Sequence, residues 1–149
     1  MSGNGHISNS ELRKQMHHPV IDADGHWLEF GPLAREQMRK IGGDVAVEGF
    51  NMFPKLVDKH LTMSVAERRK RRIGQQAFWS LPTKNTRDRA TAMMPQLQYE
   101  RMDELGLDFS VMYPTAGLGL PLIADAETRR VTCRAFNTFS ADHFRDFSD

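Results

Sequence analysis

The chain has little of three features that would assign it to a specialised class. Its 149 residues include one cysteine, Cys133, which excludes an internal disulfide and a zinc cluster built from several cysteines. The 20 Lys and Arg nearly balance the 19 Asp and Glu, and the resulting charge of +1 disfavours binding to nucleic acid or anionic membranes by overall charge. No apolar run approaches the roughly 20 residues of a membrane span, and Met1–Ser10 lacks the order of a secretion signal. We therefore expect a cytoplasmic protein without a membrane partner.

What is present is the composition of an ordinary folded domain, with 40% hydrophobic and 26% charged residues. The first residues are rich in Gly, Ser and Asn and predict a flexible segment over residues 1–18. The folded part then covers residues 19–149. Within it, residues 44–91 carry few periodic signals and are interpreted as an irregular or helical insertion, in which Ser64 and Glu67 form a capping box.

Strands alternate with helices in the rest of the chain. The β-branched and alternating residues of 20–27 and 109–113 predict two short strands. Helices are expected from Pro32 to a stop at Gly42–Gly43, from Pro95 to a stop at Gly106, and after a capping Asp125. This order predicts an α/β fold with parallel strands.

The first strand carries polar groups that could bind a metal. Because side chains alternate along a strand, Asp22, Asp24 and His26 are expected on one face. A carboxylate and an imidazole two residues apart can both reach a divalent ion such as Zn²⁺. From spacing alone the alternative stays open that Asp24 and His26 form only a hydrogen-bonded polar pair.

Three sequence blocks add a resemblance to a known family. The block HPVIDADGHWLE (His18–Glu29) resembles the first strand of the amidohydrolase superfamily, specifically the amidohydrolase-related group (amidohydrolase family 2) that includes aminocarboxymuconate semialdehyde decarboxylase-like enzymes. The block Tyr99–Pro114 resembles the helix that leads into the second strand of that group. Arg134–Phe139 resembles the following helix with its aromatic-Asn signature, and the blocks occur in the family's order.

The resemblance implies the first two strands and associated helices of a metal-dependent (β/α)₈ TIM barrel. It implies that Asp24 and His26 are metal ligands, and that Glu29 is a candidate metal or substrate contact with a surface carboxylate as the alternative. Because Asp24 stands where many members have a histidine, both Zn²⁺ and Mn²⁺ are expected as the metal. The activity implied is hydrolysis of a small-molecule substrate by metal-activated water, or non-oxidative decarboxylation as the alternative.

The length of the chain conflicts with a whole barrel, which typically needs ~250 residues. We therefore expect a truncated barrel, an incomplete active site and catalytic residues on strands that this chain lacks. The expected consequences are exposed sheet edges and exposed helix faces, which predict self-association or pairing with a complementing fragment. The helix faces in question carry Met38, Met102, Phe136 and Phe139.

Two functions without catalysis remain as alternatives. The truncated barrel could serve as a non-catalytic interaction fragment. The run Arg68–Arg72 has five consecutive basic residues, which suggests phosphate contacts, but a solvated helix face is the simpler interpretation and no nucleic-acid partner is expected.

Overall fold

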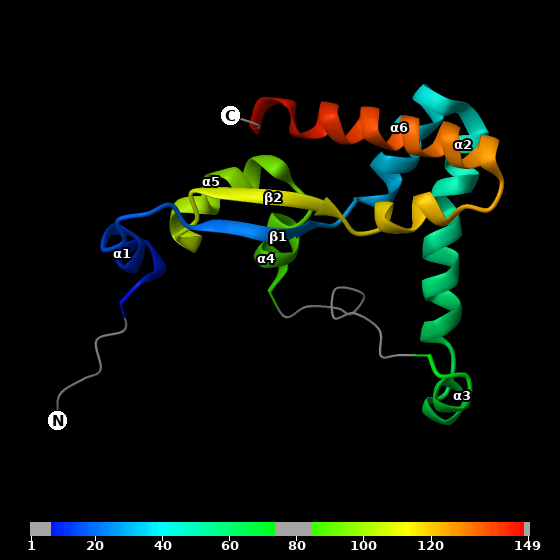
Figure 1. Cartoon of the computed structure of the whole chain (residues 1–149), viewed down its shortest axis with the longest axis horizontal. Helices are drawn as coiled ribbons and strands as arrows, with labels where there is room; N and C mark the ends of the chain where they lie inside the picture. Colours follow the sequence, from blue (N-terminus) through cyan, green and yellow to red (C-terminus); the bar gives the residue numbers. More distant parts are fainter. Residues whose placement is uncertain (1–6, 74–84, 148–149) are drawn as a thin grey trace.

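The computed structural model describes residues 7–73 and 85–147 as a mixed α/β structure that is mostly helical, with a two-stranded parallel sheet (Figure 1). No helix in these two ranges is long and apolar enough to cross a membrane. The elements in chain order are α1 (Asn9–Lys14), β1 (Ile21–Trp27), α2 (Gly31–Leu61), α3 (Val65–Lys70), α4 (Thr86–Thr91), α5 (Pro95–Leu105), β2 (Phe109–Pro114), the 3₁₀ helix η2 (Gly117–Leu122), α6 (Ala126–Phe144) and the 3₁₀ helix η3 (Arg145–Phe147).

Both expected strands are present and pair in parallel. The end signals of the helices around β2 also act as predicted. Gly106 ends α5 in the left-handed conformation with φ of 76°, which glycine adopts without steric cost. The side chain of Asp125 accepts a hydrogen bond from the backbone N–H of Thr128 and so caps α6.

The expected helix stop at Gly42–Gly43 is wrong. Gly43 leaves helical geometry, with φ of 67° and ψ of −163°, but the chain resumes as helix and continues to Leu61. The sequence signal for a stop therefore marks a kink. The second half of α2 stays in place because Ala46, Val47 and Phe50 are buried against the rest of the core. Helix thus covers much of the expected irregular or helical insertion, of which residues 74–84 lie outside the described part.

The core forms mainly where α2 and α6 pack together, at one end of the sheet (Figure 1). The expectation that Met38, Phe136 and Phe139 would be exposed is wrong, since each is at most 4% exposed. The longer α2 supplies the partner surface that the sequence analysis did not foresee. Met102 is only partly buried. The buried apolar residues are Trp27, Ala34, Met38, Ala46, Val47, Phe50, Leu120, Ile123, Ala135, Phe136 and Phe139.

Part of the N-terminal segment is folded. The side chain of Ser8 accepts a hydrogen bond from the N–H of Glu11 in a capping box, and so starts α1. Arg13 then binds Asp108 through two hydrogen bonds, of 2.5 and 2.8 Å, and Asp108 also accepts a bond from the N–H of Val20. The carboxylate of Asp108, placed just before β2, therefore anchors the entry to β1. This anchoring replaces the expected flexibility over the helical part of residues 1–18, while residues 1–6 lie outside the described part.

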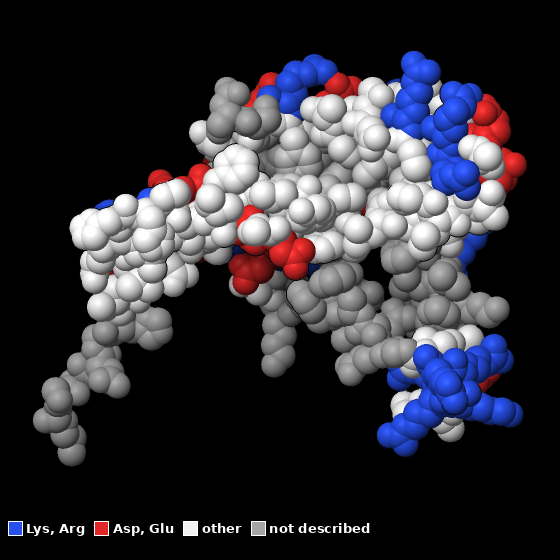
Figure 2. Space-filling view, viewed as in Figure 1, with Lys and Arg blue, Asp and Glu red and all other residues white. Residues whose placement is uncertain are grey.

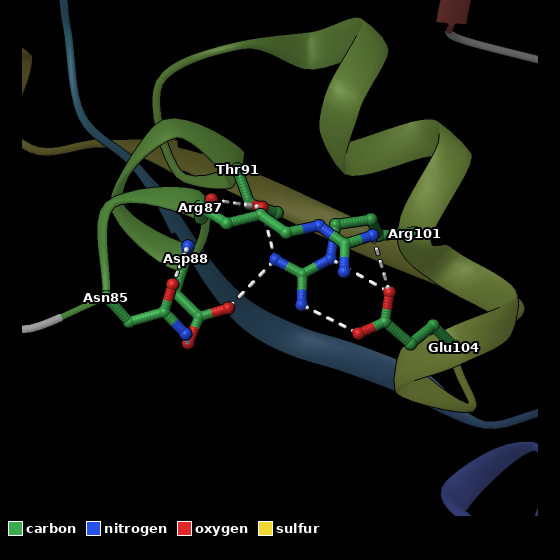
Figure 3. Close-up of polar contacts among 6 residues, drawn as sticks. All are labelled: Asn85, Arg87, Asp88, Thr91, Arg101 and Glu104. Atoms are coloured by element: carbon green, nitrogen blue, oxygen red, sulfur yellow. Dashed lines mark hydrogen bonds and ion pairs between the residues drawn. The ribbon is translucent and has the colours of Figure 1, made fainter.

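A charged cluster attaches α4 to α5 (Figure 3). The Arg101 side chain is 8% exposed and donates two hydrogen bonds to the carboxylate of Glu104, at 2.9 and 3.1 Å. It also donates to Asp88, at 2.9 Å, and to the hydroxyl of Thr91. These bonds raise the pKa of the guanidinium above its already high value, so Arg101 is always charged. The cluster fixes α4, whose following residue Ala92 accepts a hydrogen bond from the N–H of Leu28 just after β1.

The contact between Gly49 of α2 and Thr132 of α6 provides a test of the helix packing. A Cβ atom at position 49 would overlap Thr132 Oγ1. We expect Gly49→Ala to lower the free energy of unfolding by about 1–3 kcal/mol, measured by urea denaturation, because the two helices must move apart. Adding Thr132→Ala should recover part of the loss, since it removes the overlapping oxygen.

Gly31→Ala is the matched control for this prediction, because a Cβ atom there meets only the flexible end of Arg35. It should leave the urea midpoint nearly unchanged. Equal destabilisation by Gly31→Ala and Gly49→Ala would contradict the close packing of α2 and α6.

Candidate metal site

The two strands pair with a register shift that changes which residues share a face. Asp22 pairs with Ser110 and His26 with Tyr113, so β1 has one residue more than β2 between these two pairs. Ser110 and Tyr113 are three residues apart in β2 and therefore point to opposite faces. Their partners Asp22 and His26 therefore also point to opposite faces. The expectation that Asp22 shares a face with His26 is wrong. The extra residue is a β-bulge, which the alternation rule does not anticipate.

Asp24 and His26 are nevertheless brought together. Oδ1 of Asp24, in the middle of β1, lies 4.0 Å from Nε2 of His26, one residue before the strand ends. The Asp24 side chain is 90% exposed, while the His26 side chain is 25% exposed. Two ligand atoms that each bind one ion at ~2.0–2.2 Å are at most about 4.4 Å apart, and about 3.4 Å apart in tetrahedral geometry. A small rotation of the exposed Asp24 side chain is enough to reach the tetrahedral separation.

The other nitrogen of His26 faces the end of β2. Nδ1 lies 3.3 Å from Oγ1 of Thr115, the residue that follows β2. The same hydroxyl donates a hydrogen bond of 2.8 Å to the backbone carbonyl of Trp27. The Tyr113 ring lies beside the imidazole, with a distance of 6.3 Å between ring centroids. His26 is thus held against β2, while the neighbouring Trp27 is buried on the opposite face.

Glu29 has a role within the protein fold. Its carboxylate is partly buried and accepts hydrogen bonds from the N–H groups of Ala116, at 2.8 Å, and Gly117, at 2.9 Å. Burial raises the pKa of the carboxyl, and the bonds from the two N–H groups oppose this rise. Its observed contacts link the chain after β1 to the chain after β2, as the Thr115 hydroxyl also does. Whether Glu29 also reaches a metal or substrate stays a prediction.

Among the described residues, Asp24 and His26 are the two side chains at this place that could bind a metal. Within residues 7–73 and 85–147, no group of three or more His, Cys, Asp and Glu side chains is arranged to hold a metal ion. A groove of about 430 Å³ lies between α5, β2 and the end of α6, and neither Asp24 nor His26 lines it. Catalytic zinc sites have three protein ligands and a water. The pair alone therefore offers fewer ligands than such a site would need.

Sequence reasoning missed Thr115 as a partner of the site. The signal available was a hydroxyl directly after the second strand, because parallel strands end at the same edge of a sheet. The sequence analysis also did not place His143 beside Trp27. Its ring centroid lies 5.2 Å from that of Trp27, and burial lowers its pKa.

The basic run Arg68–Arg72 lies far from the strands. Figure 2 shows these side chains gathered over α3, at the end of the arm formed by α2. Arg71 forms an ion pair with Glu67 at 2.7 Å. The backbone N–H of Glu67 also donates a hydrogen bond to the side chain of Ser64, which caps α3. This arrangement is that of a solvated helix face and contributes no group to the Asp24–His26 pair.

The contacts of Glu29 lead to a prediction. Glu29→Ala removes the acceptor for two backbone N–H groups, and we expect the free energy of unfolding to fall by about 1–3 kcal/mol, measured by urea denaturation. Glu36→Ala, which removes an exposed partner of Lys40, is the control and should have little effect. An unchanged urea midpoint for Glu29→Ala would contradict the role of Glu29 in linking the chain after β1 to the chain after β2.

Comparisons with protein-family models, curated proteins and solved structures found no match to this chain. The resemblance to the amidohydrolase-related group therefore depends on the three sequence blocks themselves. Inference about function depends on the geometry of the Asp24–His26 pair and its surroundings.

Proposed function

We propose that this chain provides the first-strand half of the metal site of a metal-dependent hydrolase, with Asp24 and His26 as ligands for Zn²⁺ or Mn²⁺. The observation that supports the proposal is the 4.0 Å separation of Asp24 Oδ1 and His26 Nε2 in the carboxyl-terminal half of a parallel strand. Active sites of (β/α)₈ barrels lie at this end of their strands. We propose further that the two strands and their helices are the start of such a barrel, and that the protein is cytoplasmic.

The proposed chemistry follows from the donor set. A bound metal would lower the pKa of a water molecule or polarise a carbonyl oxygen of a small-molecule substrate, which suits hydrolysis and equally the alternative, non-oxidative decarboxylation. A carboxylate and an imidazole are ligands that Zn²⁺ and Mn²⁺ both accept. Since Asp24 and His26 would provide only two ligands, we propose that further ligands come from a complementing chain.

Metal binding tests this proposal directly. We expect the chain to bind one Zn²⁺ or Mn²⁺ in isothermal titration calorimetry, and Asp24→Asn and His26→Gln each to weaken binding at least tenfold, because each removes one ligand. Asp22→Asn is the matched control. Its carboxylate lies on the other face, beside Ser110, and accepts a hydrogen bond from the N–H of Asp24 at 3.1 Å. The amide oxygen of Asn can keep this bond, so Asp22→Asn should leave the affinity unchanged.

Other outcomes would contradict the proposal. Equal weakening by Asp22→Asn and Asp24→Asn would show that binding follows the general charge of the strand. Two ligands should bind an ion at least weakly, so failure of the folded wild-type chain to bind either metal even at high metal concentration would show that the pair is only a polar contact. Circular dichroism of each variant would confirm that the fold is retained.

A second candidate function is association through the sheet, and one observation favours it. The residues Phe109, Val111 and Tyr113 all point to the same face of β2 and are 52%, 36% and 42% exposed. Ile21, which pairs with Phe109, adds a side chain that is 54% exposed. We call this set of four residues the open face. Contiguous exposed apolar surface of this kind favours contact with another protein surface, here a second copy of the chain.

Sedimentation velocity tests this association. We expect the wild-type chain to form a dimer as its concentration rises, and Val111→Lys to remain monomeric, because a charge would be buried in the contact. Leu122→Lys is the control, since Leu122 is 84% exposed on η2 and outside the open face. A wild-type chain that stays monomeric, or a dimer lost equally in both variants, would contradict this function.

A further inference from the structure

The hydroxyl of Thr115 has one proton to donate, and the structure shows where it goes. Thr115 is 8% exposed, and its Oγ1 lies 2.8 Å from the carbonyl oxygen of Trp27. A carbonyl oxygen can only accept a hydrogen bond, so the hydroxyl donates its proton to Trp27. The oxygen of Thr115 is then an acceptor toward every other partner.

This direction determines the tautomer of His26. The second partner of Oγ1 is Nδ1 of His26, at 3.3 Å. Because the hydroxyl proton is already used, this hydrogen bond requires a proton on Nδ1. In the neutral imidazole the lone pair then lies on Nε2, which is the nitrogen 4.0 Å from Asp24 Oδ1.

We propose that Thr115 is a positioning residue that holds His26 as the Nδ1–H tautomer and thereby directs the lone pair of Nε2 toward Asp24. Thr115 touches neither the metal nor the substrate in this proposal. It acts through His26, in the way that second partners of metal-binding histidines fix ring orientation and tautomer. The consequence for metal affinity rests on the proposed metal site, whereas the tautomer itself does not.

The tautomer can be measured on the metal-free chain by two-dimensional ¹H–¹⁵N NMR of the imidazole nitrogens, at a pH where His26 is neutral. His26→Gln identifies the signals by their loss. We expect the wild-type chain and Thr115→Ser, which keeps the hydroxyl, to have the proton on Nδ1. Thr115→Val has nearly the same shape without the hydroxyl, and it should shift the population toward the Nε2–H tautomer.

Zn²⁺ affinity gives a second measurement on the same variants. We expect Thr115→Val to bind Zn²⁺ about 10–100-fold more weakly than wild type and Thr115→Ser to bind nearly as well. If Thr115→Val disturbs the fold by leaving the Trp27 carbonyl without its partner, the wild-type and Thr115→Ser spectra still decide the tautomer.

The NMR and Zn²⁺-binding measurements test the role of Thr115 and the proposed metal site separately. A proton on Nε2 in the wild-type chain, or a Thr115→Val chain that is folded and keeps the Nδ1–H tautomer, would overturn the role of Thr115. The wild-type chain could have the Nδ1–H tautomer, Thr115→Val could lose it, and the wild-type chain could still bind no metal. This combination would support the role of Thr115 and contradict the proposed metal site.

Discussion

The site depends on the one extra residue that β1 carries between Asp22 and Gly25. Without this bulge, strict alternation would place Asp22 on the face of His26. With it, the Asp22 carboxylate turns toward Ser110, while Asp24 stays beside His26 and remains exposed. Gly25 makes the bulge sterically feasible, because a Cβ atom there would lie 2.5 Å from Ser110 Oγ. The bulge therefore selects which of two similar carboxylates joins the imidazole.

The helical core holds the other side of the same strand. Trp27 is 3% exposed, and its ring lies 5.8 Å from Phe139 and 5.2 Å from Phe144, both on α6. Adjacent residues of a strand point to opposite faces, so the burial of Trp27 fixes His26 on the face that carries Tyr113. The packing of α2 against α6 thus has a consequence at the site through Trp27. A core mutation in this interface is expected to affect His26 through Trp27.

Local signals predicted the elements well, and tertiary contacts decided what these signals could not. The left-handed Gly106 and the capping Asp125 act within one turn of chain and could be recognised from sequence. Gly43 gave the same kind of signal, but the helix continues beyond it because the residues after it are buried in the core with α6. The closeness of Asp24 and His26 was predictable from their spacing, whereas the position of Asp22 depends on a register with β2. The contact of His26 with Thr115 joins residues 89 positions apart and has no local signal.

The two proposed ligands differ in how firmly they are held, and this difference has a physical consequence. His26 is fixed through Thr115, and the chain after β2 is in turn fixed by the bonds from Ala116 and Gly117 to Glu29. The Asp24 side chain is 90% exposed and retains its rotamer freedom. Binding of an ion would then order mainly the short side chain of Asp24, which costs less entropy than ordering both ligands. In the proposed site, the preorganised imidazole would set the direction of binding and the exposed carboxylate would adapt to the ion, which suits either Zn²⁺ or the harder Mn²⁺.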